Sequence, residues 1–331
     1  MIQDMHQSIE IIYLILSPFF KLFRHKKKKT CAFHPHRRYN LSSAFSLPSP
    51  PLPRWCSVPP SHTTGNSKKW RNFCAFLPAT MATDFWTSTH YKQLLDQEDV
   101  DVVHSLDKER GITLEDFKLI KLHMTNYIVR LAQNVKVRQR VVATAVTYMR
   151  RAYTRRSMVE YDPRLVAPTC LYLASKAEES TVQARLLVFY IKKLYADEKY
   201  RYEIKEILEM EMKILEALNY YLVVFHPYRA LSQLLQDAGM SDATQMIWGL
   251  INDTYKMDLI LIYPPHLIAL ACIYVASMFK DKDNTSWFEQ LRVDMNMVEK
   301  IATEILDFYD YHKTISEEKV NAAMLKLTMR M

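Results

Sequence analysis

A thirteen-residue stretch occurs twice in this chain, and this duplication limits the possible folds more than any other feature. Residues 163–175 read PRLVAPTCLYLAS and residues 265–277 read PHLIALACIYVAS, so seven of the thirteen positions are identical at an offset of 102 residues. Solenoid repeats are shorter, at roughly 20–50 residues, so this period indicates a duplicated domain of several helices. Neither stretch has a polar face. Each is therefore predicted to be the central buried helix of its own bundle.

The remaining pattern predicts an all-α chain. Only 4 of the 331 residues are glycine, which argues against Gly-rich nucleotide loops and hairpin-rich β folds. Thr113 and Asp116 form a predicted capping box, and Asp162 followed by Pro163 is a typical helix start. Apolar spacing predicts helices near 113–133, 137–153, 163–179, 182–195 and 201–218, and again near 228–237, 242–257, 265–279, 285–291 and 295–312.

Residues 259–279 are apolar enough to resemble a membrane span. Pro264 and Pro265 interrupt this segment, and the corresponding helix of the first unit lies between Asp162 and Lys176. A buried core helix is therefore predicted, and no membrane partner is expected.

The first eighty residues differ in composition from the rest of the chain. They contain 12 Lys and Arg but only two acidic residues, whereas the other 251 residues contain 32 basic and 34 acidic residues. We expect residues 1–80 to be a disordered, Pro-rich extension, or residues upstream of a true start at Met81. An organelle transit peptide and a basic nuclear-import sequence at Lys26–Lys29 are the alternatives. Because the remainder is not basic, no direct nucleic-acid partner is predicted.

No catalytic motif is present in the sequence. It lacks the phosphate-binding loop, the dinucleotide-binding loop, the kinase catalytic loop and the zinc-protease motif. The five cysteines include no C-x-x-C pair, which excludes a standard zinc ribbon. We therefore expect a protein that is not an enzyme, with no catalytic residues, metal, cofactor or small-molecule substrate.

One carboxylate lies on the apolar stripe of the helix near 201–218. Glu211 shares this stripe with Ile204, Ile207 and Leu208, and a buried carboxylate is costly unless it is paired. Lys176 ends an otherwise apolar helix and is the obvious partner. The alternative is that Lys176 only complements a helix C-terminus and that Glu211 lies at an exposed rim.

Four segments resemble the cyclin family. Residues 173–179 (LASKAEE) close the central helix of the first unit in the manner of a cyclin. Residues 85–91 (FWTSTHY), 225–229 (FHPYR) and 251–272 narrow the resemblance to cyclin C, most closely its plant forms, from Met81 to near the end of the chain. The resemblance implies two tandem five-helix cyclin boxes after the disordered extension. The domains implied by the resemblance are an N-terminal kinase-contacting segment at 81–110, a first box at 111–223, a second box at 224–315 and a C-terminal tail at 316–331.

This resemblance implies a nuclear regulatory subunit that activates a cyclin-dependent kinase of the Mediator complex and so regulates transcription by RNA polymerase II. Other subunits of the Mediator kinase module are implied as further partners. The implied kinase-binding residues are Lys176, Glu211, Glu179, Phe85 and Trp86. The implied Mediator groove consists of Trp248, Asn252 and Asp253.

Several alternatives stay open at this point. Phe85 and Trp86 could form a lid on the core of the chain, and Trp248 could be a core residue. Met278 replaces Lys176 in the second unit, so only the first box is expected to bind the kinase.

Another transcriptional cyclin is one rival, and a DNA-binding factor resembling transcription factor IIB is the other, although it would require a zinc ribbon and a basic core. Six arginines are predicted to form a solvated face or a docking site for an acidic or phosphorylated segment: Arg138, Arg140, Arg150, Arg151, Arg155 and Arg156.

Overall fold

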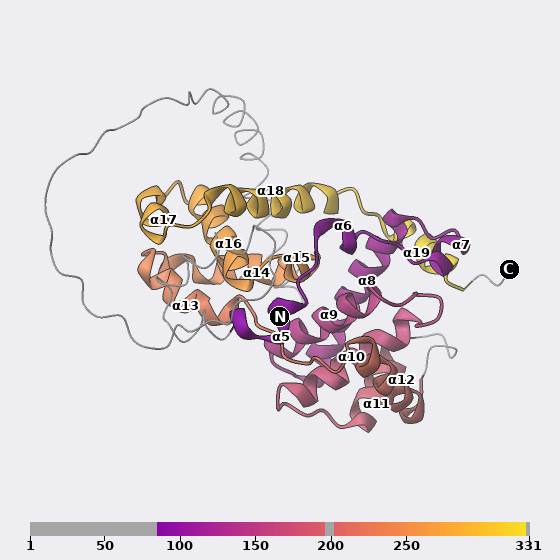
Figure 1. Cartoon of the computed structure of the whole chain (residues 1–331). Helices are drawn as coiled ribbons and strands as arrows, with labels where there is room; N and C mark the ends of the chain where they lie inside the picture. Colours follow the sequence, from indigo (N-terminus) through magenta and orange to yellow (C-terminus); the bar gives the residue numbers. More distant parts are fainter. Residues whose placement is uncertain (1–84, 196–201, 329–331) are drawn as a thin grey trace, which may run out of the picture. The chain divides into compact units, whose positions relative to one another are not determined.

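The computed structural model describes residues 85–195 and 202–328 of the chain. The extension predicted for residues 1–80 and the start predicted at Met81 lie outside these residues. Every regular element in the described ranges is a helix (Figure 1), as the sequence predicts.

The first bundle is built around one central helix. α10 (Pro163–Ala177) packs against each of the other four helices of this bundle. Its Ala167, Cys170 and Leu171 are completely buried, as expected for a helix that is apolar on all faces. The surrounding helices are α8 (Leu114–Val135), α9 (Gln139–Tyr153), α11 (Ala184–Leu194) and α12 (Ile204–Ala217).

The second bundle repeats this plan. α16 (Pro265–Phe279) is its buried centre and packs against α13, α14, α15 and α18. The elements around it are α13 (Tyr228–Asp237), η3 (Ser241–Ala243), α14 (Thr244–Thr254), α15 (Leu259–Ile262), α17 (Thr285–Leu291) and α18 (Met295–His312). Residues 259–279 form two helices, and no helix of the described ranges is long and apolar enough to cross a membrane.

The predicted helix starts have the hydrogen bonds that define them. The Thr113 backbone N–H donates to the Asp116 carboxylate at 2.9 Å, and the Asp116 N–H donates to the Thr113 hydroxyl at 3.2 Å. Asp162 accepts from the Arg164 N–H at 2.9 Å, ahead of Pro163 at the first helical position. At both helix N-termini, a free backbone N–H group is bonded by a side chain of the same turn. This is why both could be predicted from short motifs.

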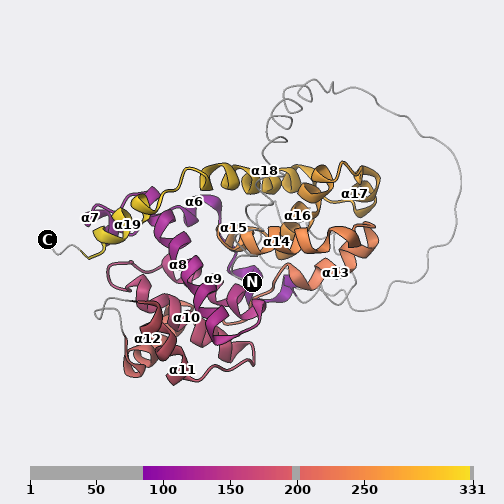
Figure 2. The same ribbon diagram turned by 180° about the vertical axis from the view of Figure 1, so that it is seen from behind.

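Besides α15, four short or terminal helices were not predicted. The C-terminal helix, α19 (Glu317–Lys326), forms most of the region predicted to be a tail at 316–331. It packs on α8 of the first bundle (Figure 2), so this region is part of the fold. The Lys326 ammonium lies 2.6 Å from the Asp116 carboxylate in this contact. The four helices are α5 (Thr89–Lys92), α6 (Gln97–Val100), α7 (Ser105–Glu109) and α19 (Glu317–Lys326).

A buried arginine joins the two bundles. Arg150 of α9 donates from Nη1 to the Asp258 carboxylate at 2.7 Å and from Nε to the Tyr255 carbonyl at 3.0 Å. Its Nη2 donates to the Lys256 carbonyl at 2.6 Å. The guanidinium therefore satisfies the carbonyl end of α14, where the helix dipole favours a cation.

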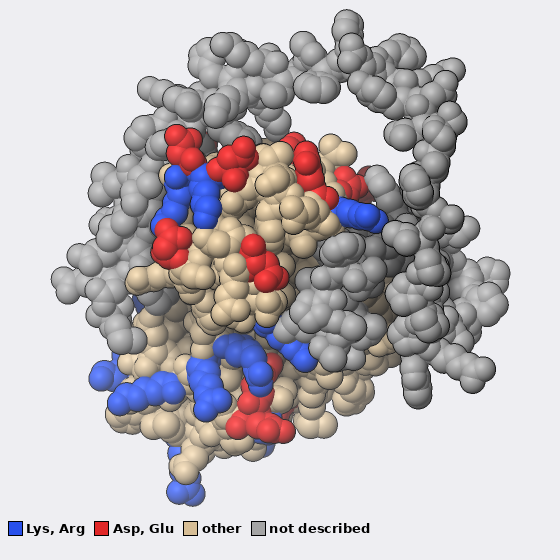
Figure 3. Space-filling view, turned by 90° about the vertical axis from the view of Figure 1, so that its left-hand side faces the viewer, with Lys and Arg blue, Asp and Glu red and all other residues tan. Residues whose placement is uncertain are grey.

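The predicted solvated face of arginines is wrong for two of its six members. Arg150 and Arg151 are each only 2% exposed, because α9 is buried on every side from residue 141 to 153. Arg138, Arg140 and Arg155 are exposed. Figure 3 shows Lys and Arg side chains gathered over the first bundle on one side of the protein.

Candidate functional site

The ion pair predicted between the two central charges of the first bundle is present. The Lys176 ammonium at the end of α10 lies 2.8 and 2.9 Å from the two carboxylate oxygens of Glu211 on α12. The Glu211 side chain is 8% exposed and that of Lys176 is 40% exposed. Burial alone would lower the pKa of Lys176, but the hydrogen bond and charge of Glu211 raise it above its ordinary value. Glu211 is therefore buried and paired, which excludes the exposed-rim alternative.

Exposed apolar side chains lie beside Glu211 on α12 and on the neighbouring helix α11. On α12, Leu208 is 42% exposed and Met212 is 55% exposed, one turn before and one residue after Glu211. On the neighbouring α11, Leu186 is 42% exposed and Phe189 is 60% exposed. Exposed apolar groups of this size around a charged pair are typical of a protein-binding surface. Periodicity places Leu208 on the buried stripe, so only the packed structure reveals this part of the surface.

The end of α10 is held by a carboxylate that the sequence analysis did not single out. Glu178 accepts from the Thr144 hydroxyl at 2.7 Å and pairs with Arg140. Burial would raise the pKa of Glu178, but the nearby His226 ring, the hydrogen bond from Thr144 and the charge of Arg140 lower it. Glu179, the predicted kinase contact, follows with a left-handed φ of 53° and an exposed side chain. Glu178 thus fixes the helix end, while Glu179 faces solvent.

The aromatic pair before the first box divides between the interior and the surface. Phe85 is 4% exposed, with its ring centroid 5.6 Å from that of Phe225 and 5.5 Å from that of His90. This burial favours the lid alternative for Phe85 over an anchor in a partner. Trp86 keeps an exposed part, with its ring 5.7 Å from His266. For Trp86, the contact with a kinase stays a prediction.

The three residues predicted to line a groove on the second box do not all face the same way. Trp248 is 39% exposed and stacks on Tyr228 at 4.7 Å between ring centroids, so it is not a core residue. Asn252 accepts from the Tyr228 hydroxyl at 2.6 Å. Asp253 is only 7% exposed and accepts from the Tyr309 hydroxyl at 2.8 Å.

The prediction of Asp253 as a groove residue therefore needs correction. Asp253 pairs with Lys256 at 2.8 Å and packs inward, because one residue beyond Asn252 the helix has turned by about 100°. Tyr228 joins Trp248 and Asn252 in its place. The sequence analysis missed this role because Tyr228 belongs to another helix.

The described residues contain no group of three or more His, Cys, Asp or Glu side chains placed to hold a metal ion. Cys170 and Cys272 are free thiols in the two central helices. Burial raises the pKa of both thiols, so they pack as apolar groups.

Comparison with known proteins gives close relatives. The family model described as "Cyclin, N-terminal domain" matches residues 90–223. The chain is 70% identical over 249 residues to Cyclin-C1-2 of Arabidopsis thaliana, covering 75% of this chain and 98% of that protein. It is 72% identical over 253 residues to Cyclin-C1-1 of Oryza sativa subsp. japonica, with coverage of 75% and 98%. Cyclin-C of Rattus norvegicus is 40% identical over 259 residues, covering 74% of this chain and 90% of that protein.

Solved structures share the fold at low identity. A chain of the yeast RNA Pol II CTD kinase CTDK-1 complex superposes with a TM-score of 0.55 and 18% identity, covering 66% of this chain and 73% of that chain. A chain of the yeast TFIIK complex gives a TM-score of 0.52 and 19% identity, with coverage of 66% and 99%.

Proposed function

Because the chain belongs to the cyclin family, as a member of the cyclin C type, we propose that it activates the cyclin-dependent kinase of the Mediator complex. The chain is the regulatory subunit, and the catalytic groups belong to the kinase. By this proposal it acts in the nucleus, and the kinase phosphorylates the C-terminal repeat domain of RNA polymerase II. The kinase assemblies among the structural neighbours are consistent with a kinase-activating role.

The observation that carries the proposal is the Lys176–Glu211 pair inside an exposed apolar surface. The two side chains are already oriented by each other, at 2.8 Å, so little side-chain entropy is lost when a partner binds. The pair retains hydrogen-bonding capacity for a partner backbone, since an ammonium has three N–H groups and a carboxylate has several acceptor positions. Met212, the next residue after Glu211, provides exposed apolar area beside the pair, and Phe189 provides more on the neighbouring α11.

The mechanism is a population shift in the kinase. An active kinase requires an ion pair between a strand lysine and a glutamate of its regulatory helix. A cyclin that binds this helix only in its inward position stabilises the active conformation by the difference in binding free energy. Lys176 and Glu211 would hold the end of that helix, while the apolar side chains of α11 and α12 cover its face.

A second surface would connect this two-protein complex to the rest of the kinase module. Trp248 and Asn252 of α14, with Tyr228 of α13, form an aromatic and amide cluster on the second box, in which Trp248 is exposed and the other two are half-buried. At the end of α16, Met278 stands where α10 has Lys176, so the second box lacks the cation of the kinase site. We propose that this box binds another Mediator subunit.

The kinase site is tested by Lys176→Ala and Glu211→Ala in the full chain. Each should weaken kinase binding by about 2–5 kcal/mol, because truncating one member leaves the other buried or half-buried without its partner. Lys319→Ala is the control, since this exposed lysine lies on α19, outside the two helices of the proposed kinase site. Binding and activation should be measured with the kinase that co-purifies from a nuclear extract. Normal binding of both variants would contradict the assignment, and a co-purifying kinase from outside the Mediator complex would contradict the proposed function.

A further inference from the structure

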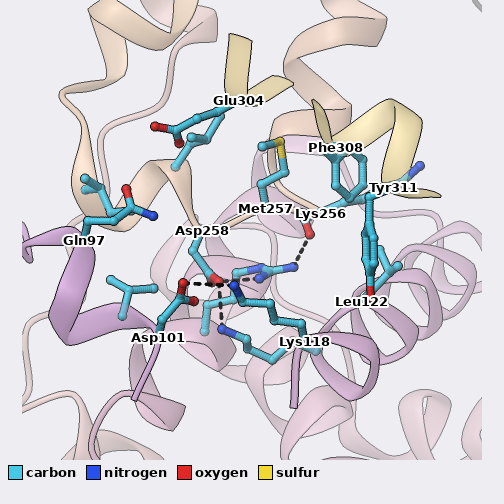
Figure 4. A pocket seen from close by; sticks show the side chains of 15 residues that line it. Gln97, Asp101, Lys118, Leu122, Lys256, Met257, Asp258, Glu304, Phe308 and Tyr311 are labelled. Atoms are coloured by element: carbon cyan, nitrogen blue, oxygen red, sulfur yellow. Dashed lines mark hydrogen bonds and ion pairs between the residues drawn. The ribbon is translucent and has the colours of Figure 1, made fainter. Parts of the chain in front are cut away.

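The two boxes and α6 line a hollow of about 180 Å³ that has charged side chains and an apolar wall (Figure 4). α8 contributes Lys118 and Lys121, α9 contributes Arg150, and the turn before α15 contributes Asp258. This hollow involves neither the Lys176–Glu211 pair nor the Trp248 surface. Part of its lining is apolar and comes from Leu122, Met257 and Phe308.

The cations at the bottom of the hollow outnumber their carboxylate. Asp258 accepts from Lys121 at 2.7 Å and from Arg150 at 2.7 Å, and these two cations are 3% and 2% exposed. Arg150 uses its other N–H groups on the carbonyls of Tyr255 and Lys256. Lys121 has three N–H groups, and Asp258 accepts from one of them. Among the buried cations of the hollow, Lys121 is therefore the one with N–H groups left to bind a further acceptor.

A second cation lies one turn away on the same face of α8. Lys118 is 42% exposed and pairs with Asp101 at 2.9 Å, which also leaves it spare N–H groups. The two remaining charges of the lining are already engaged: Lys256 with Asp253, and Glu304 with the Tyr263 hydroxyl. One added carboxylate between Lys118 and Lys121 would give both cations a further acceptor, and it would balance the lining, which has four cations but only three carboxylates.

The size and lining of the hollow restrict the ligand. Sites for drug-sized ligands have about 300–1,000 Å³, so this hollow is too small for a nucleotide. It has the volume of about six water molecules, which suits a single side chain. The apolar wall would contact a methylene stem, which free phosphate lacks. We propose that the hollow receives a glutamate side chain from an acidic segment of a partner polypeptide, with its carboxylate bound between Lys118 and Lys121.

A titration of the full chain with the capped peptide acetyl-Ala-Leu-Glu-Leu-Ala-amide tests the proposal. NMR signals of labelled lysine side chains would report binding, with the glutamine form of the peptide as the comparison. The glutamate peptide should bind about tenfold more tightly, as expected for a charged hydrogen bond. Lys118→Gln should weaken its binding by about two- to fivefold, since this lysine is half-exposed. Lys205→Gln on α12 should have no effect.

Lys121→Met should abolish the preference for glutamate, because Asp258 keeps Arg150 as its partner while the buried donor is lost. Its fold should be checked by thermal melting, and if it unfolds, the Lys118→Gln result decides. Equal affinity for the glutamate and glutamine peptides would overturn the proposal. So would normal binding by Lys118→Gln. Inorganic phosphate that binds as tightly as the glutamate peptide would show an adventitious anion site and would also overturn it.

Discussion

At the scale of single residues, Asp258 determines the charge balance between the two boxes. Burial alone would raise the pKa of its carboxyl group, but the charges of Lys121 and Arg150 outweigh this and hold the pKa well below its ordinary value. Burial lowers the pKa of Lys121 despite this pairing, since a 3% exposed ammonium has lost most of its hydration. The carboxylate therefore stabilises the fold by compensating two cations that cannot reach water.

The pH dependence of stability follows from the direction of this shift. A carboxyl group with a depressed pKa in the folded state contributes its full stabilisation above the unfolded value of about 4, and this is lost as the pH falls below it. Asp258→Asn should lower the free energy of unfolding at pH 7 by about 3–5 kcal/mol and flatten its decline between about pH 5 and pH 2. Urea unfolding at several pH values measures both effects. If the unfolding free energy of Asp258→Asn declined with falling pH as steeply as that of the wild type, Asp258 would not be the group responsible.

Trp248 is predicted to be a binding residue with little effect on folding. Trp248→Ala should cost only about 0.5–1.5 kcal/mol from the lost stacking on Tyr228, because the indole is 39% exposed. It should impair assembly with Mediator subunits while the cyclin–kinase pair survives. Leu250→Ala on the same helix is the contrasting variant: its side chain is 1% exposed, and it should cost about 2–5 kcal/mol. A collapse of the Trp248→Ala melting temperature would mean that the indole is a packing residue.

At the scale of elements, the two central helices show how one packing role supports two surfaces. α10 and α16 each have fifteen residues, begin at a proline and bury the same apolar positions except Leu165, which is half-buried where its counterpart Leu267 is buried. They differ at the C-terminal end, where α10 has Lys176 and α16 has Met278. The buried middle is constrained by packing, whereas the exposed end is free to acquire a binding function.

α19 is predicted to stabilise the first box from outside. A chain that ends at residue 315 loses the Lys326–Asp116 ion pair at 2.6 Å and the hydrogen bond from Arg164 to the Met324 carbonyl at 3.1 Å. The unfolding free energy should fall by about 1–2 kcal/mol, since the ion pair is partly exposed and Ala323 is the main buried side chain of α19. Hydrogen exchange should accelerate in α8 and stay unchanged in α16. Unchanged protection of α8 would show that α19 contributes nothing.

At the scale of the whole described region, contacts from several elements join the two boxes. The Leu95 N–H donates to the Leu261 carbonyl at 2.8 Å. Burial lowers the pKa of His90 to about 3, so its ring is neutral. Its Nδ1 accepts from the Phe225 N–H at 3.0 Å, which leaves Nε2 as the donor toward the Ile260 carbonyl at 3.4 Å. The N-terminal segment is thus held against the second box, and its Asp101 pairs with Lys118 of the first box at 2.9 Å, so it connects the two.

Arg150 makes three hydrogen bonds from the first box to the second, so its loss should uncouple the boxes. Wild-type protein should melt in one transition, and Arg150→Met should melt in two, with Asp258 still paired to Lys121 in the folded state. Calorimetry, combined with hydrogen exchange in α10 and α16, would assign each transition to its box. Arg155→Met is the control, since this arginine is exposed and bonds within the first bundle, to the Ala217 carbonyl. A single transition in Arg150→Met would show that the remaining contacts suffice.

The sequence by itself determined the helical class, the duplication and the two central helices, because apolar periodicity and capping motifs act over a few residues. α13, α16, α17 and α18 begin and end where the pattern predicted. The Lys176–Glu211 pair was also predictable. Lys176 ends an otherwise apolar helix and Glu211 lies on an apolar stripe. Each charge is costly to bury alone, so the opposite charge is its obvious partner.

Only the tertiary structure decided which polar residues face inward. The burial of Arg150 depends on Asp258, which is 108 residues away in the chain. The inward position of Asp253 depends on Tyr309, and the burial of Phe85 depends on Phe225. No local pattern reports these partners, because a polar side chain is equally compatible with solvent and with a distant counter-charge until packing brings the two together.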